Sequence, residues 1–187
     1  METSDRTLEV ATEVAALLRN EGYPCAVIGA VALAVHGYPR ATEDLDLATL
    51  VRTPRELTEL ARHLRERGFE VHVAMPDAEY PLGGVITVTT ADSDPVQVVN
   101  YFNPWNGWAP CGKAALDAAV HEVLPGLPVV DVPHLVALKL YAGGRKSALD
   151  VLELLGRQDT KEVEAARAVC HALGLAAQFE AVLPSGP

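Results

Sequence analysis

The segment Gly29-Ala-Val-Ala-Leu-Ala-Val-His-Gly-Tyr-Pro-Arg-Ala-Thr-Glu-Asp-Leu-Asp-Leu47 decides the fold of this 187-residue chain. The small and apolar residues from Ala30 to His36 predict a short helix, which Gly37 and Pro39 end. A buried strand is expected just before it, at residues 25–28. A strand followed by a glycine and then a helix leaves free backbone N–H groups at the helix start, where phosphate is favoured.

The second half of this segment carries two aspartates. Asp44 and Asp46 alternate with Leu45, Leu47 and Leu50, which predicts a strand with one apolar and one acidic face. Two carboxylates on one face repel each other and would be costly to bury unpaired. A divalent cation relieves this, and Mg²⁺ binds one or two carboxylates together with substrate phosphates. The pattern predicts a metal–triphosphate site, although a solvated face of an ordinary sheet gives the same alternation.

Hydrophobic periodicity places the other elements. Further strands are expected at 69–73, 85–90, 96–102 and twice within 122–132, and further helices at 5–21, 54–67, near 113–119, at 133–142, 146–156, 160–173 and 175–182. Residues 103–112 look irregular. Strands dominate the first two thirds and helices the last third, so the fold class is α+β. We expect a core over residues 1–132 and a helical part over 133–187 packed on it as one compact unit.

The arrangement of Gly29, His36-Gly37 and Arg40-x-Thr-x-Asp-Leu-Asp46 resembles the nucleotidyltransferase superfamily of the DNA polymerase β type, and most closely its small AbiEii-type, stand-alone bacterial branch. The resemblance implies a mixed β-sheet flanked by helices. It also implies that Asp44 and Asp46 hold Mg²⁺ or Mn²⁺ and that Gly29 and Ala30 contact the triphosphate of an NTP substrate. Arg40 and Thr42 match the segment that leads into the acidic pair, and the resemblance implies that both belong to the nucleotide-binding residues.

A second match begins at His134, in Leu-Val-Ala-Leu-Lys-Leu-Tyr-Ala-Gly-Gly-Arg-Lys-Ser-Ala-Leu-Asp150. It is similar to the branch's Leu-x-x-x-Lys-x-x-Ala pattern, which continues to an arginine or lysine and then an aspartate. The resemblance implies that Lys139 contacts nucleotide phosphates, that Arg145 and Lys146 bind nearby, and that Asp150 supports the site. The alternative interpretation of this stretch is an exposed helix hairpin with charges on its solvent face, which the match upstream makes the less favoured of the two.

The chain departs from the family pattern at three places. Ala30 replaces the second glycine or serine of the turn, so a hydroxyl contact to phosphate is lost. Ser147 follows Lys146 where the family has aspartate. Most important, Gln97 lies between Val96 and Val98, the context in which many members carry a third aspartate. An amide accepts no proton at useful pH, so Gln97 cannot serve as the base for an incoming hydroxyl.

Composition and net charge argue against several classes of partner and of protein. The net charge of −10 argues against sequence-independent binding of duplex DNA. Cys25, Cys111 and Cys170 are too scattered for a disulfide framework and fit reduced thiols in a cytoplasm. A polar N-terminus and short apolar runs predict neither a signal peptide nor a membrane span. The interleaved Arg and Glu residues of 52–67 favour a solvated, ion-paired helix face over an RNA track.

Four aromatic or imidazole positions have two interpretations each. His36 is more typical of packing than of a metal ligand or base. Trp105, Trp108 and Tyr101 fit packing on their own fold, with substrate stacking as the alternative.

Three functional hypotheses follow. The first is a metal-dependent nucleotidyltransferase that moves NMP from an NTP to a hydroxyl on a small molecule, a protein or an RNA end. The second, motivated by Gln97, is a catalytically degenerate nucleotide-binding or interaction module on the same fold. The third is the toxin of a toxin–antitoxin pair.

Overall fold

The computed structural model describes residues 4–105 and 107–183. Within them, seven strands form one mixed sheet in the order β3-β4-β5-β2-β1-β9-β8, and two short strands form a separate hairpin. The sheet strands are β1 (Cys25–Val27), β2 (Leu45–Thr49), β3 (Glu70–Ala74), β4 (Val85–Thr89), β5 (Val96–Asn100), β8 (Val120–Leu124) and β9 (Leu127–Val129), and the hairpin joins β6 (Phe102–Asn103) to β7 (Gly107–Trp108).

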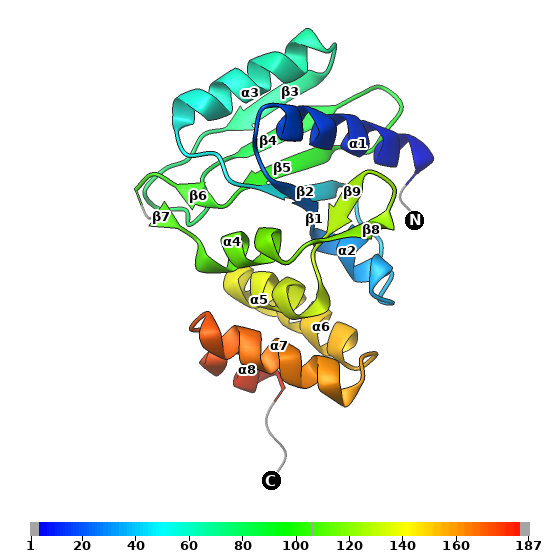
Figure 1. Cartoon of the computed structure of the whole chain (residues 1–187), viewed down its shortest axis with the longest axis vertical. Helices are drawn as coiled ribbons and strands as arrows, with labels where there is room; N and C mark the ends of the chain where they lie inside the picture. The colour runs from blue at the N-terminus through cyan, green and yellow to red at the C-terminus, as the bar shows by residue number, and fades with distance from the viewer. Residues whose placement is uncertain (1–3, 106, 184–187) are drawn as a thin grey trace.

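The helices lie on both sides of this sheet (Figure 1). They are α1 (Asp5–Asn20), α2 (Gly29–Val35), α3 (Pro54–Glu66), α4 (Pro110–Asp117), α5 (Val132–Ala142), α6 (Gly144–Leu155), α7 (Thr160–Ala172) and α8 (Ala176–Val182). In Figure 1, α1 and α3 lie above the sheet, and α4 and α5 lie below it. Helices α6 and α7 pack against α5 at the lower end of the molecule, and α8 packs against α6 and α7. The α+β class predicted from the sequence is confirmed.

The central strands position the candidate site. Strand β2 runs antiparallel to β1 and parallel to β5, and its Asp46 is in register with Gln97 of β5. Their neighbours Leu45, Leu47, Val96 and Val98 are fully buried. Because successive side chains of a strand point to opposite faces, Asp46 and Gln97 share the face opposite these four residues. The prediction that Gln97 lies beside the acidic pair, with valines turned into the core, is confirmed.

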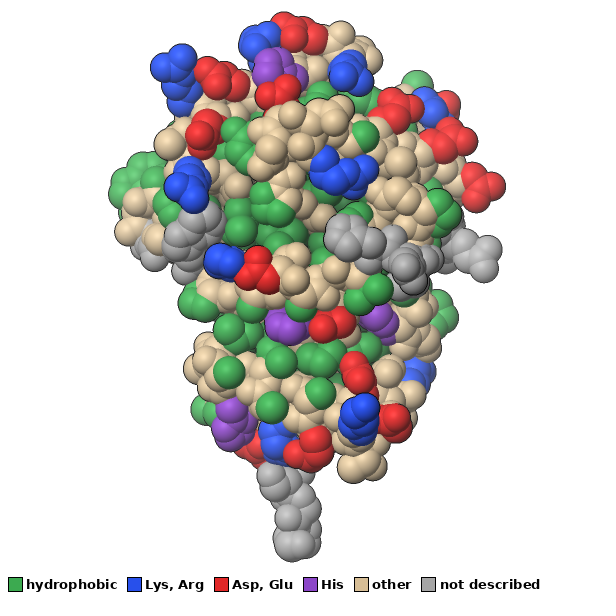
Figure 2. All heavy atoms as spheres, viewed as in Figure 1, with side chains coloured by type: hydrophobic (Ala, Val, Ile, Leu, Met, Phe, Trp, Pro, Cys, Tyr) green, Lys and Arg blue, Asp and Glu red, His purple; other side chains and the backbone are tan. Residues whose placement is uncertain are grey.

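Local sequence signals explain the helix starts. Ser4 accepts the N–H of Thr7 and begins α1, and Thr53 forms a capping box with Glu56 before Pro54 opens α3. The charged face of α3 is exposed and ion-paired, as predicted, through Arg55–Glu59 and Arg62–Glu66. Figure 2 shows these basic and acidic side chains interspersed at the top of the molecule.

Several predicted boundaries were wrong. Asp44 precedes β2 rather than lying in it, and Leu50 follows it. Residues 103–112 are not irregular: they hold most of the β6–β7 hairpin and the start of α4 at Pro110, three residues before the predicted helix. Two-residue strands are too short for an alternating pattern to show, and proline at the first helical position was a signal that went unused. No described helix is long and apolar enough to cross a membrane.

Candidate active site

Gly29 and Asp46 meet at the turn between β1 and α2. Gly29 has φ +65°, a left-handed conformation that disfavours any side chain. A Cβ atom at this position would lie 2.0 Å from Oδ2 of Asp46. The backbone approaches the carboxylate so closely that only glycine fits, and the start of α2 therefore lies against the acidic pair. Ala30, the next residue, is buried in the first turn of this helix.

The carboxylate of Asp44 is held by two neutral side chains. Thr42 donates its hydroxyl to Oδ1 at 2.8 Å, and the amide of Gln97 donates to Oδ2 at 2.9 Å. The Thr42 hydroxyl also lies 3.2 Å from the backbone oxygen of Asp44. Both oxygens of Asp44 are therefore oriented by partners from the preceding loop and from β5.

Asp46 differs from its neighbour. Among the described residues, no side chain or backbone N–H donates to its carboxylate. Burial, together with the negative charge of Asp44, raises the pKa of Asp46 to about 6. The positive charges of Lys139, Arg40 and Lys146 act in the opposite direction and lower this pKa. Two acidic and three basic side chains thus share one electrostatic environment, although they come from segments about a hundred residues apart.

A buried ion cluster lies beside the acidic pair. Asp150 of α6 accepts Nε of Arg40 at 2.9 Å, Nη2 of Arg40 at 3.2 Å and Nζ of Lys139 at 2.7 Å. The Asp150 side chain is 3% exposed, while those of Arg40 and Lys139 are 18% and 14% exposed. We call Arg40, Lys139 and Asp150 the ion cluster. It joins the loop before β2 to both helices of the second sequence motif.

The remaining predicted residues occupy the rim. Lys146 is exposed and lines an open groove of about 590 Å³ with Ala41, Thr42, Glu43 and Asp44. Arg145 is exposed as well but does not line this groove. Sequence reasoning missed Glu43, whose place directly before Asp44 was the available signal.

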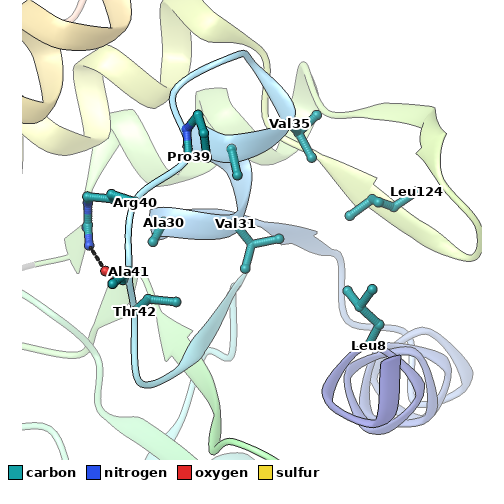
Figure 3. A pocket seen from close by; sticks show the side chains of 10 residues that line it. Leu8, Ala30, Val31, Val35, Pro39, Arg40, Ala41, Thr42 and Leu124 are labelled. Atoms are coloured by element: carbon teal, nitrogen blue, oxygen red, sulfur yellow. Dashed lines mark hydrogen bonds between the residues drawn. The ribbon is translucent and has the colours of Figure 1, made fainter. Parts of the chain in front are cut away.

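A second groove, of about 400 Å³, lies on the other side of the loop between α2 and β2 (Figure 3). Its walls are mainly apolar and include Leu8, Val31, Val35 and Leu124. In Figure 3 the Arg40 guanidinium lies on the opposite side of the loop from Leu8 and Leu124. The loop at residues 39–42 therefore separates an apolar groove from the charged site.

The acidic pair has the chemistry of a divalent-cation site. Asp46 offers a carboxylate with no donor among the described residues, and the Asp44–Asp46 repulsion that raises its pKa is what a cation removes. Hard carboxylate oxygens suit Mg²⁺ or Mn²⁺. No third acidic, cysteine or histidine side chain joins them within the described ranges. The protein ligands for such a cation are two, which leaves coordination positions for phosphate oxygens.

Of the remaining candidates, His36, Tyr101 and Cys25 pack within the fold. His36 is hydrogen-bonded through Nε2 to the backbone oxygen of Val130 at 2.7 Å, as expected for a packing histidine. Tyr101 is buried against α4, where a Cβ on Gly112 would lie 2.3 Å from its ring. Cys25 is buried, as predicted, and Trp105 is exposed. The side chain of Trp108 lies outside the described residues.

Solved structures share this fold. A nucleotidyltransferase-like antigenic protein from Paracoccidioides brasiliensis is 16% identical and matches 98% of this chain and 99% of its own, with a TM-score of 0.52. A Thermotoga maritima protein, provisionally assigned as a nucleotidyltransferase, is 17% identical over 84% of this chain and 97% of its own, with a TM-score of 0.54. ANT(2'')-Ia, solved with adenylyl-2''-tobramycin, is 16% identical over 96% and 95%, with a TM-score of 0.50.

No protein-family model and no curated protein matches the sequence. At these identities the solved structures establish the fold alone: the chain has the α+β fold of the nucleotidyltransferases.

Proposed function

We propose that this protein is a metal-dependent nucleotidyltransferase that moves NMP from an NTP to a hydroxyl group and releases pyrophosphate. The observation that carries the proposal is Asp46: a carboxylate without a hydrogen-bond donor among the described residues, against Gly29 and beside Asp44. Lys139, Arg40 and Lys146 place positive charge around it. A cation-binding pair surrounded by basic side chains is complementary to a metal–triphosphate, which joins a cation to a polyanion.

Asp44 and Asp46 would hold the metal, which when bound supplies Lewis-acid activation and neutralises phosphate charge. Thr42 and Gln97 keep Asp44 oriented. Lys139 and Lys146 attract the phosphates as point charges. In the transfer, the acceptor oxygen forms a bond to the α-phosphorus while the bond from that phosphorus to the bridging oxygen breaks. Pyrophosphate leaves with the electron pair, and the hydroxyl proton passes to solvent because the Gln97 amide cannot accept it.

Gln97 also favours a second candidate function. Its amide lies in register with Asp46 and donates to Asp44, where the family resemblance places a third carboxylate. A protein with this substitution would bind NTP and metal and turn over little, acting as a nucleotide-binding module. The AbiEii-type branch and the role of a toxin rest on the sequence motifs alone. The acceptor classes stay those expected from the sequence: a small molecule, a protein or an RNA end.

The test combines binding with turnover. Thermal unfolding is measured with Mg²⁺ or Mn²⁺ and each of the four NTPs, and labelled NTP is incubated with cell extract as the source of acceptor. We expect a metal-dependent NTP shift that the Asp44→Ala/Asp46→Ala double variant loses. Glu59→Ala/Glu66→Ala on α3 is the matched control, because it also removes two partly exposed carboxylates. A shift without label transfer favours the binding module, and a shift that survives in the Asp44→Ala/Asp46→Ala variant removes the metal site.

A further inference from the structure

The guanidinium of Arg40 is bonded within the chain through all three of its nitrogens. From this we infer that Arg40 is a positioning residue, which fixes the loop leading into Asp44 rather than binding nucleotide phosphate. The inference rests on the proposed function, because the site it positions is the proposed metal site. It departs from the family resemblance, which puts Arg40 among the nucleotide contacts.

The hydrogen bonds of Arg40 and Lys139 show the difference between an anchor and a phosphate ligand. Arg40 donates Nε and Nη2 to the two oxygens of Asp150, and Nη1 to the backbone oxygen of Ala41 at 3.1 Å. Bidentate pairing of this kind fixes direction as well as distance. Lys139 uses one of its three N–H groups on Asp150, within the part of the chain that the structure describes. Lys139 therefore keeps two N–H groups on a flexible stem that can turn toward a phosphate. Arg40 keeps one N–H on each Nη, but its bidentate pair with Asp150 fixes the plane of the guanidinium and ties it to α6.

The loop needs such an anchor because one of its sides is open. Residues 39–42, Arg40 among them, line the apolar groove of about 400 Å³, so core packing does not hold the loop from that direction (Figure 3). On the opposite side Arg40 reaches Asp150, which is 3% exposed within α6. The helix α6 thus fixes the loop through a desolvated charge pair.

Arg40 is connected to the acidic pair through Thr42. Arg40 lies two residues before Thr42, and Thr42 donates to Oδ1 of Asp44 at 2.8 Å. Asp46 belongs to β2 and is held by the sheet, whereas Asp44 lies outside the strand. A loop released from Asp150 would therefore move Asp44 relative to Asp46. The separation of the two metal ligands depends on Arg40, and the loss of Arg40 should weaken metal binding before it weakens contact with phosphate.

The experiment replaces Arg40 with lysine, which keeps the positive charge and loses the bidentate hydrogen-bonding geometry of the guanidinium. Arg55→Lys on α3 is the matched control, because Arg55 is exposed and far from the site. Three quantities are compared with the wild type: hydrogen exchange of the amides at 40–44, affinity for Mn²⁺ alone, and affinity for each NTP at saturating Mn²⁺. We expect Arg40→Lys to exchange about tenfold faster and to bind Mn²⁺ about tenfold more weakly, with NTP affinity within about twofold.

The opposite pattern overturns the inference. If Arg40→Lys lowers NTP affinity at saturating Mn²⁺ while exchange and Mn²⁺ affinity match the wild type, Arg40 is a phosphate ligand. If all three quantities are unchanged, the loop does not depend on Arg40. A wild-type protein that binds neither Mn²⁺ nor NTP refutes the proposed function, and the exchange rates of Arg40→Lys then still decide whether Arg40 anchors the loop.

Discussion

The acidic pair and the ion cluster are adjacent groups of charged side chains that differ in how fully their carboxylates are hydrogen-bonded. In the ion cluster, the Asp150 carboxylate receives three donors from Arg40 and Lys139, and all three side chains are largely buried. In the acidic pair, Asp44 is hydrogen-bonded but Asp46 has no donor among the described residues, and its pKa is raised to about 6. The chain satisfies one group internally, and in the proposed function a bound cation completes the other.

This difference separates scaffold from binding site. A cluster whose charges are all paired within the chain holds its segments in place, and its disruption leaves unpaired charge in the interior. An open pair of like charges costs stability, and a protein retains it where a ligand binds. The ion cluster should therefore respond to substitution chiefly through stability and geometry, and the acidic pair through ligand binding.

The largest expected effect comes from adding a third carboxylate to the open group. Gln97→Asp places a potential base in register with Asp46, so we expect single-turnover transfer to rise, by up to about 10²- to 10⁴-fold, the usual range for general base catalysis. The rate is measured at fixed Mg²⁺, with NTP affinity measured in parallel and expected to change little. Gln97→Asn is the control, since it shortens the side chain without adding a base. Fast wild-type turnover that falls in Gln97→Asp would exclude the degenerate-enzyme hypothesis.

The second prediction removes the central carboxylate of the ion cluster. Asp150→Ala removes the shared partner of Arg40 and Lys139 and leaves two largely buried cations. We expect the free energy of unfolding to fall by about 3–5 kcal/mol, the usual cost of breaking a buried ion pair. Asp117→Ala breaks the exposed pair with Lys113 and should cost at most about 1 kcal/mol. Urea unfolding compares the two, and equal losses would show that the ion cluster is no more than a surface salt bridge.

The same contrast explains what the sequence could predict. The strand, glycine, helix and Asp-x-Asp pattern lies within nineteen consecutive residues, from Gly29 to Leu47, where local periodicity determines which side chains share a face. Alternation also turned Val96 and Val98 to the face opposite Gln97, while the place of this strand beside Asp46 was expected from the family resemblance.

The unpredicted features depend on tertiary contacts. The resemblance implies only that Asp150 supports the site, whereas its pairing with Arg40 joins residues 110 positions apart, a contact that no local pattern encodes. The close approach of Gly29 to Asp46 likewise arises only when β1, β2 and α2 come together, as does the lack of a donor to Asp46 within the described part of the chain.

The third prediction measures the cost of leaving the acidic pair open. The folded pKa of Asp46 lies near 6 against an ordinary 3.8, so the folded state binds a proton that the unfolded state has already lost. Stability should therefore fall as pH rises from about 4 to about 7. Asp46→Asn should remove this dependence and stabilise the metal-free protein by about 1–3 kcal/mol at pH 7.5, with no gain below pH about 3.5. Denaturant unfolding at a series of pH values is the measurement.

Metal supplies the control for this titration. Saturating Mg²⁺ should stabilise the wild type at pH 7.5 and leave Asp46→Asn nearly unchanged, because the variant lacks the second carboxylate. If Asp46→Asn is less stable than the wild type at neutral pH, the carboxylate has a favourable partner and the acidic pair is not open.

The smallest expected effect distinguishes the two basic residues at the rim. Lys146 lines the groove beside Asp44, and its charge lowers the pKa of Asp46, whereas Arg145 is exposed and does not line that groove. Lys146→Ala should weaken NTP binding about three- to fivefold at low salt, since an exposed charge contributes at most about 1 kcal/mol. The loss should shrink as salt is added, because salt screens exposed charges.

Arg145→Ala, which removes the same charge one residue earlier, should change NTP affinity less than twofold, and neither variant should change stability by more than about 0.5 kcal/mol. Titration calorimetry at two salt concentrations makes the comparison. Equal losses in both variants would mean that NTP responds to the net charge of α6 and not to the position of Lys146 beside the acidic pair.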